Sequence, residues 1–149
     1  MCSEAKWLRQ SGLILLLPHG FDGSGPEHST CHIERFLQNV NSSAYDHNSS
    51  FDNLNAQNIN FQVAQCTMPS NYFHILRRQM LRDFRKPLVI AAPKIGLKHP
   101  RANSHISEFD IGTQFRPIIA NQFGTRSIKR VIFCSGKISL DVEARLEKA

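Results

Sequence analysis

Two short, wholly apolar runs constrain the fold of this chain more than any other feature. Residues 12–17 read Gly-Leu-Ile-Leu-Leu-Leu, and residues 87–92 read Pro-Leu-Val-Ile-Ala-Ala. Runs of this length between turn-forming residues are typical of strands that are buried on both faces of a parallel sheet. A membrane-spanning helix would need about 20 apolar residues in a row. The runs therefore predict two buried strands and no membrane segment.

Helical segments alternate with these strands along the chain. Residues 61–66 predict a further strand, and residues 130–134 predict a fourth. Helices are expected over three ranges, the first capped by Ser29 or Thr30: about 31–38, 71–84 and 138–148. The order strand, helix, strand, helix, strand predicts an α/β fold with a parallel sheet.

The helix predicted over 71–84 has two distinct faces. Its apolar residues recur at helical spacing, and we expect them to face the core: Phe73, Leu76, Met80 and Phe84. Its arginines are expected on another face: Arg78, Arg82 and Arg85. No nucleic-acid motif accompanies these arginines, which favours a solvated face or contact with an acidic partner surface over nucleic-acid binding.

The net charge of +6 is concentrated in one quarter of the chain. Residues 77–101 contain eight basic residues and one acidic residue, a local balance of +7, so the remainder carries −1. A basic segment leaves an anionic partner open as a function. The four cysteines form no close pairs, which predicts a reducing compartment and no disulfide scaffold.

The segment 18–36 is the richest in chemistry. It leaves the carboxyl end of a predicted strand, passes Gly20, Gly23 and Gly25, and enters a predicted helix at His28. Ligands of open α/β sheets bind at this position, and glycines allow close approach of a bound group. At a helix start, the helix dipole would keep His28 neutral. A neutral imidazole suits a residue that hydrogen-bonds a carboxylate or transfers a proton. A tight structural turn remains the alternative.

Metal and phosphate sites are less well supported. His19, His28, Cys31 and His32 are possible zinc ligands, but no Cys-x-x-Cys or His-Glu-x-x-His pattern occurs. The glycine spacing does not match a dinucleotide loop, and no Gly-Lys-Ser/Thr follows. The cysteines at 31, 66 and 134 adjoin apolar elements and are interpreted as packing residues.

Two segments interrupt the regular elements. Residues 39–60 are rich in Asn and Ser without any periodicity, which predicts a surface insertion. Residues 94–122 are irregular and contain Pro100 and Pro117, directly after Pro93, which indicates a connector on the surface.

Six ordered blocks of sequence resemble the 2-oxoglutarate dehydrogenase family, the decarboxylating first components of 2-oxo acid dehydrogenase complexes. The first block joins Leu15–Ser29 to Ile33–Gln38, which contain Pro-His-Gly-Phe-Asp-Gly-Ser-Gly-Pro-Glu-His-Ser and Ile-Glu-Arg-Phe-Leu-Gln. The other segments that match are Tyr72–Gln79, Phe84–Leu88, Pro93–Lys94 with His99–Pro100, Gly112–Phe115 and Phe133–Lys137. The resemblance covers nearly the whole chain except the insertion. His32 and Lys98 depart from it, since the family more often has Arg there.

The resemblance implies a site and its cofactors. His28 and His19 correspond to catalytic positions, while Gly20, Gly23, Gly25 and Ser29 shape the loop that faces the cofactor. The implied cofactors are thiamine diphosphate and magnesium, whose diphosphate and metal site lies outside this chain; no metal ligand is expected within it. The implied partners are a second subunit, as a homodimer, and a lipoyl-bearing succinyltransferase component, with neither nucleic acid nor membrane.

The resemblance also implies how the chain is divided. Residues 1–110 correspond to the later part of a transketolase-like pyrimidine-binding domain, and residues 111–149 to a connector and the start of a second α/β domain. The chain is then a fragment that is inactive alone, from an enzyme that decarboxylates 2-oxoglutarate in the tricarboxylic acid cycle. The alternatives are 2-oxoadipate as substrate or a non-catalytic basic module. The implied location is the mitochondrial matrix in a eukaryote and otherwise the cytoplasm.

Overall fold

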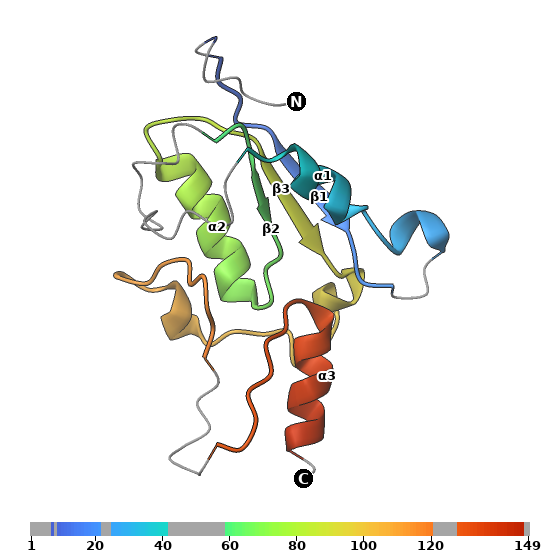
Figure 1. The fold of residues 1–149 in the computed structure, drawn as a ribbon. Helices are drawn as coiled ribbons and strands as arrows, with labels where there is room; N and C mark the ends of the chain where they lie inside the picture. The colour runs from blue at the N-terminus through green and yellow to red at the C-terminus, as the bar shows by residue number, and fades with distance from the viewer. Residues whose placement is uncertain (1–6, 8, 22–24, 42–58, 121–127, 148–149) are drawn as a thin grey trace.

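Three parallel strands form the centre of the fold. The computed structural model describes residues 7, 9–21, 25–41, 59–120 and 128–147. The strands lie in the order β1-β3-β2 and have these bounds: β1 Ile14–Pro18, β2 Gln62–Ala64 and β3 Leu88–Ala92 (Figure 1). Both pairings are parallel, which confirms the predicted α/β class.

The two apolar runs differ in burial although both form strands. Strand β3 lies between β1 and β2, and four of its side chains are at most 1% exposed: Leu88, Val89, Ile90 and Ala91. Leu16 of β1 lies opposite Ile90 in the register but is 58% exposed. The prediction of two buried faces is therefore correct for β3 and wrong for β1, where the described residues leave the Leu16 side chain largely uncovered.

Helix α2, Pro69–Leu81, connects β2 to β3 and packs on the sheet (Figure 1). Pro69 occupies the first turn, where its missing N–H leaves no bond unmade. Ile75 of α2 forms the buried core with Cys66, Leu88 and Ile90. Burial of one such aliphatic side chain contributes about 1.5–3 kcal/mol to folding.

The face of α2 that packs inward is not the one expected. Phe73 and Met80 are 43% and 65% exposed, and Phe84 lies beyond the end of the helix. Of the predicted stripe, Leu76 packs against the core. The buried residues of the helix are mostly polar and bond to neighbouring segments: Ser70, Asn71, His74, Ile75 and Gln79. Hydrogen bonding thus outweighs apolar periodicity in orienting α2.

Two of the arginines predicted on a solvated face are half-buried against the chain itself. The Arg78 guanidinium lies 4.5 Å from the Phe115 ring centroid and donates to Gln62 Oε1 at 3.3 Å. Burial, with a smaller contribution from Arg82, lowers the pKa of Arg78 to about 10. Arg82 lies over the Phe84 ring at 5.2 Å. The solvated-face prediction is wrong for these two residues.

Helix α1, Ile33–Asn39, leads to the predicted insertion, most of which lies outside the described residues. Asparagine side chains join the two ends of the insertion. The Asn60 backbone N–H donates to Asn41 Oδ1 at 2.9 Å, and the Asn41 N–H donates to Asn60 Oδ1 at 3.3 Å. Asn60 Nδ2 also donates to the Asn39 carbonyl at 2.7 Å. This reciprocal pair closes the insertion at its base.

The connector and the last helix follow β3. Short 3₁₀ turns occupy Lys94–Leu97 and Ile106–Phe109, and α3 spans Lys137–Leu146 beyond the carboxyl ends of the strands (Figure 1). None of the described helices is long and apolar enough to cross a bilayer.

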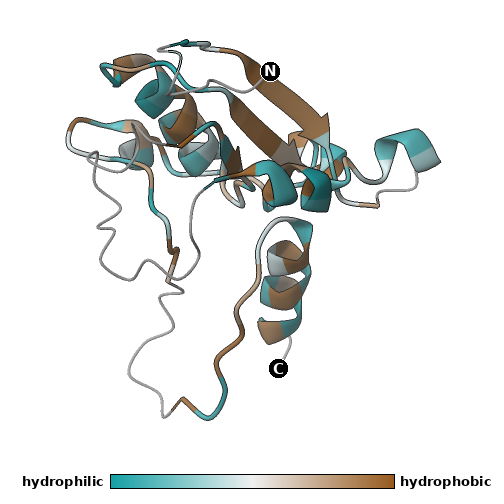
Figure 2. Ribbon diagram, turned by 45° about the horizontal axis from the view of Figure 1, so that its top comes forward, coloured by the Kyte–Doolittle hydropathy of each residue, from teal (hydrophilic) through white to brown (hydrophobic). Residues whose placement is uncertain are grey.

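The fourth strand predicted over residues 130–134 is wrong. The segment is extended but unpaired, and Val131, Ile132 and Phe133 are 66%, 55% and 89% exposed. Figure 2 shows it as a hydrophobic stretch leading into α3. Its composition suits a strand, but a strand also needs a neighbour to satisfy its backbone, and none lies beside it in the described part of the chain.

Candidate active site

The segment after β1 begins with a firmly held histidine. The His19 backbone N–H donates to the Ala92 carbonyl at 3.0 Å, which extends the β1–β3 pairing by one bond. Its side-chain Nδ1 lies 3.3 Å from Thr30 Oγ1 and 3.4 Å from the Cys31 backbone nitrogen. His19 therefore joins the end of the strand to the far end of the glycine loop.

Ser29 closes the loop. Its carbonyl accepts hydrogen bonds from the N–H groups of Gly20 and Phe21, both at 3.0 Å. Its hydroxyl donates to the Gly25 carbonyl at 2.7 Å. The structure thus brings Gly20, Gly25 and Ser29 together, while Gly23 lies outside the described residues.

Gly25 occupies a conformation that other residues adopt at a cost. Its φ is +104°, and a Cβ built there would lie 3.0 Å from both carboxylate oxygens of Glu27. Gly25 precedes a 3₁₀ turn, Pro26–His28, which Pro26 begins. The glycine lets the chain turn sharply and fixes where His28 appears.

His28 does not lie at the start of α1. It ends the 3₁₀ turn, and α1 begins five residues later at Ile33. The prediction is wrong because Ser29 closes the turn and His32, with φ of +52°, interrupts the chain before the helix. The helix-dipole argument for a neutral His28 therefore does not apply. Its side chain is 42% exposed, and Nε2 lies 3.6 Å from Glu27 Oε1.

The expected caps of α1 are also wrong. His32 is the residue that precedes the helix, and no side chain caps its first turn. The Thr30 hydroxyl instead accepts from the His32 N–H at 3.1 Å and contacts His19. Thr30 is committed to the loop and not to the helix.

Two hollows adjoin this region. One, about 640 Å³, is open and lined by residues of the loop itself: Phe21, Gly25, Pro26, Ser29, Thr30 and His32. The other, about 590 Å³, lies at the carboxyl ends of the strands and is mainly apolar, with Leu16, Cys66, Tyr72, Leu97 and Leu140 among its lining residues. Open α/β sheets bind ligands at this edge.

Residues 1–100 match the protein family described as "Transketolase, pyrimidine binding domain". The matched region contains all three strands, α2 and the glycine-histidine loop. The chain belongs to this family. The match ends at residue 100, so the domain boundary predicted at residue 110 stays a prediction. Residues 113–116 contact Arg77, Arg78 and Asn71 of α2.

Relatives of this pyrimidine-binding domain are first components of 2-oxo acid dehydrogenase complexes. "Probable 2-oxoadipate dehydrogenase complex component E1 homolog" of Dictyostelium discoideum is 50% identical over 94% of this chain and 16% of its own length. "2-oxoadipate dehydrogenase complex component E1" of Mus musculus is 50% identical over 90% of the chain and 14% of its own. "2-oxoglutarate dehydrogenase-like, mitochondrial" of Xenopus laevis is 46% identical over 91% and 14%. The chain thus spans 14–16% of the length of these relatives.

Metal ligands and reactive nucleophiles do not gather near the loop in the described part of the chain. Among the described residues, no three His, Cys, Asp or Glu side chains gather to hold a metal ion. Burial raises the pKa of the Cys66 thiol to about 11 and also raises that of Cys31, so both are poor nucleophiles. Cys134 is exposed, which makes the packing interpretation wrong for that residue.

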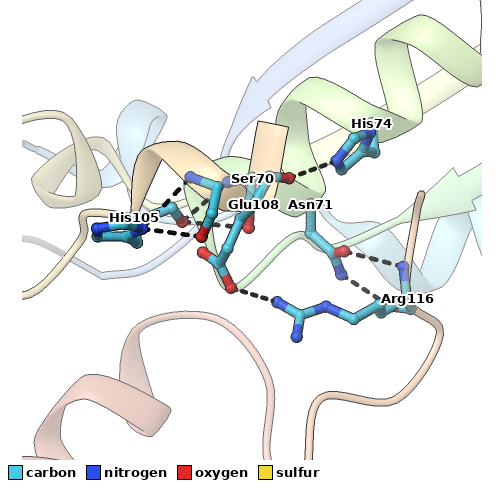
Figure 3. A network of polar contacts seen from close by, with 8 residues as sticks. Ser70, Asn71, His74, His105, Glu108 and Arg116 are labelled. Atoms are coloured by element: carbon cyan, nitrogen blue, oxygen red, sulfur yellow. Dashed lines mark hydrogen bonds and ion pairs between the residues drawn. The ribbon is translucent and has the colours of Figure 1, made fainter. Parts of the chain in front are cut away.

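Sequence reasoning missed a polar network between α2 and the connector (Figure 3). Asn71 Nδ2 donates to the Arg116 carbonyl at 2.8 Å, and the Arg116 N–H donates back to Asn71 Oδ1 at 2.9 Å. His74 Nε2 donates to the Glu108 carbonyl at 2.8 Å. The Arg116 guanidinium pairs with the Glu108 carboxylate at 2.9 Å. The only signal in the sequence was the set of polar residues in the first turns of α2.

The network also affects the ionisation of Glu108. Burial alone would raise the pKa of this carboxyl, but hydrogen bonds from Ser104 and Arg116 outweigh it and lower the pKa below its usual value. The Glu108–Arg116 ion pair therefore lies within the connector, while the bonds of Asn71 and His74 fasten the connector to α2.

Proposed function

We propose that this chain is part of a thiamine diphosphate-dependent first component of a 2-oxo acid dehydrogenase complex. The observation that carries the proposal is the loop after β1, which presents the partly exposed His28 imidazole and lines an open hollow with Gly25, Ser29 and Thr30. The family and the printed names of the relatives support the same reaction class.

The described residues fit the organic side of such a site. They supply the His32 imidazole, the Ser29 and Thr30 hydroxyl groups and the Gly25 backbone around an open hollow, whereas a magnesium–diphosphate group needs a set of oxygen ligands. When bound, the cofactor would supply the carbanion chemistry that decarboxylation of a 2-oxo acid needs. His28, exposed at the end of its turn, is placed to donate or accept a proton at Nε2. The diphosphate and its metal would be held by residues elsewhere in the enzyme.

For the substrate, the relatives support 2-oxoadipate, with 2-oxoglutarate as the alternative. The two acids differ by one methylene. A binding pocket distinguishes one methylene by about 10- to 200-fold, so both acids can react at measurable rates. We further propose a homodimer that passes its acyl group to a lipoyl-bearing transferase in the mitochondrial matrix, or in the cytoplasm if the source is bacterial.

A basic module that binds nucleic acid is not favoured by any described contact. Arg78 and Arg82, which would carry such binding, lie over aromatic rings of the chain itself. Phosphate contact would first require these stacked guanidinium groups to be released.

The decisive experiment is carbon dioxide release by the complete component that carries these residues. We expect release to require added thiamine diphosphate and to be faster with 2-oxoadipate than with 2-oxoglutarate at equal concentration. The 149 residues alone should release none. Release without the cofactor, or by the chain alone, would contradict the proposal. Faster release from 2-oxoglutarate than from 2-oxoadipate would support the reaction class but contradict the proposed substrate.

A further inference from the structure

The contacts of His19 define which of its nitrogens carries the proton. A backbone N–H can only donate, and the Cys31 N–H is directed at His19 Nδ1 over 3.4 Å. This long contact biases a neutral His19 toward an unprotonated Nδ1 with its proton on Nε2, and the Thr30 hydroxyl at 3.3 Å adds to that bias. Among the described residues no hydrogen-bond partner accepts that Nε2–H.

Thr30 reinforces the same arrangement. Its hydroxyl oxygen accepts the His32 N–H at 3.1 Å, which leaves the hydroxyl proton free to point elsewhere. His19 Nδ1, 3.3 Å away, is the acceptor on the other side. The bonds form a directed chain from the His32 amide through the Thr30 hydroxyl to the imidazole.

The local backbone is shaped around this contact at some cost. His32 adopts a left-handed φ of +52°, which is uncommon for a residue other than glycine, and α1 begins without any side-chain cap. A threonine just before a helix usually caps it. Here the hydroxyl is turned toward His19, while the backbone of His19 is held by Ala92.

We propose that Thr30 is a positioning residue that, with the Cys31 amide, holds His19 as the neutral Nε2–H tautomer. His19 then presents a fixed hydrogen-bond donor to an oxygen of the 2-oxo acid, either its carboxylate or its keto group. This role rests on the proposed function. The tautomer itself does not, because it follows from contacts within the chain.

The first test reads the tautomer directly. Solid-state nitrogen NMR of the complete component, labelled with ¹⁵N-histidine, isolates the His19 signal by subtraction of a His19→Gln sample. We expect protonated Nε2 in the wild type and in Thr30→Ser, and a mixture of tautomers in Thr30→Val, which removes the donor at nearly constant size. Protonated Nδ1 in the wild type, or an unchanged signal in Thr30→Val, would overturn the proposal.

The second test is a double-mutant cycle on carbon dioxide release. Loss of one hydrogen bond predicts a fall in kcat/KM of about 3- to 10-fold for Thr30→Val, with rescue by Thr30→Ser. In a His19→Gln background Thr30→Val should have no further effect, because Thr30 acts through His19. A full additional loss there would show a merely structural role and overturn the proposal.

The matched control removes a threonine hydroxyl elsewhere in the chain. Thr113→Val removes a hydroxyl that donates to the Asp110 carbonyl outside the loop, and it should change neither readout. If the wild-type component released no carbon dioxide from any 2-oxo acid, the proposed function would fail. The NMR result would still decide whether Thr30 fixes the tautomer.

Discussion

Strands β1 and β3 are both apolar and five residues long, but their surroundings differ. β3 has a neighbour on each side and its side chains are nearly inaccessible, whereas β1 leaves Leu16 largely exposed. The candidate site follows β1, while α2 packs against β3 and carries the polar network to the connector. The less buried strand leads into the candidate site, and the more buried one forms the core.

This division has a physical reason. A histidine that meets a substrate needs exposure and freedom to exchange contacts, which the centre of a packed sheet does not offer. The loop after β1 is held by a few hydrogen bonds centred on Ser29 and His19. Changes near β3 should therefore affect stability, and changes in the loop should affect turnover.

The sharpest test of the comparison uses the register partners Leu16 and Ile90. Ile90→Ala should lower the free energy of unfolding by about 2–5 kcal/mol, because it leaves a cavity in a fully buried core. Leu16→Ala removes a side chain that is 58% exposed and should cost less than about 1 kcal/mol. Urea denaturation followed by circular dichroism measures both. Equal losses would show that β1 is as buried as β3.

The next largest effect concerns the amide that joins α2 to the connector. Asn71→Ala leaves the Arg116 N–H and carbonyl without their partner and should cost about 1–3 kcal/mol. Asn103→Ala is the matched control, since Asn103 is exposed and bonds only to the nearby Pro100 carbonyl. Its denaturation midpoint should remain close to the wild type. A similar loss in both variants would argue against the network.

A smaller effect is expected in the loop. Ser29→Ala removes the hydroxyl bond to Gly25 but keeps the backbone bonds to Gly20 and Phe21. We expect local opening to become easier by about 1 kcal/mol, with little change in global unfolding. Hydrogen exchange should become faster at the Gly20 and Phe21 amides and stay the same in β3. Faster exchange in β3 as well would show that the two regions are not independent.

The smallest expected effect is a pH dependence from Glu108. Because its pKa is lowered in the fold, its contribution to stability is complete above the unfolded-state value and is lost as the pH falls through the folded value. Glu108→Gln should therefore show a smaller decrease in Tm between about pH 5 and pH 3 than the wild type. Glu143→Gln on α3 is the control and should follow the wild type. Parallel curves for Glu108→Gln would contradict the assignment.

The sequence allowed the parallel α/β fold to be predicted because uninterrupted apolar runs and their alternation with helical segments depend on nearby residues. It did not show that β1 lies at an edge of the sheet or that α2 buries polar residues. Nor did it show that residues 130–134 pair with no strand among the described residues. Those features depend on neighbours distant in the chain. The loop was located correctly, but its internal geometry was not, because the turn at His28 depends on Ser29 and the φ of His32.

The central claim is that the loop after β1 supplies the catalytic imidazole while β3 supplies the stability. The most direct measurement is kcat for carbon dioxide release from 2-oxoadipate by the complete component with His28→Ala, alongside its denaturation midpoint. The account predicts a fall of about a hundredfold in kcat with an unchanged midpoint, because the His28 side chain is partly exposed and lies in a long contact of 3.6 Å with Glu27. A near-normal kcat, or a loss explained by unfolding, would contradict it.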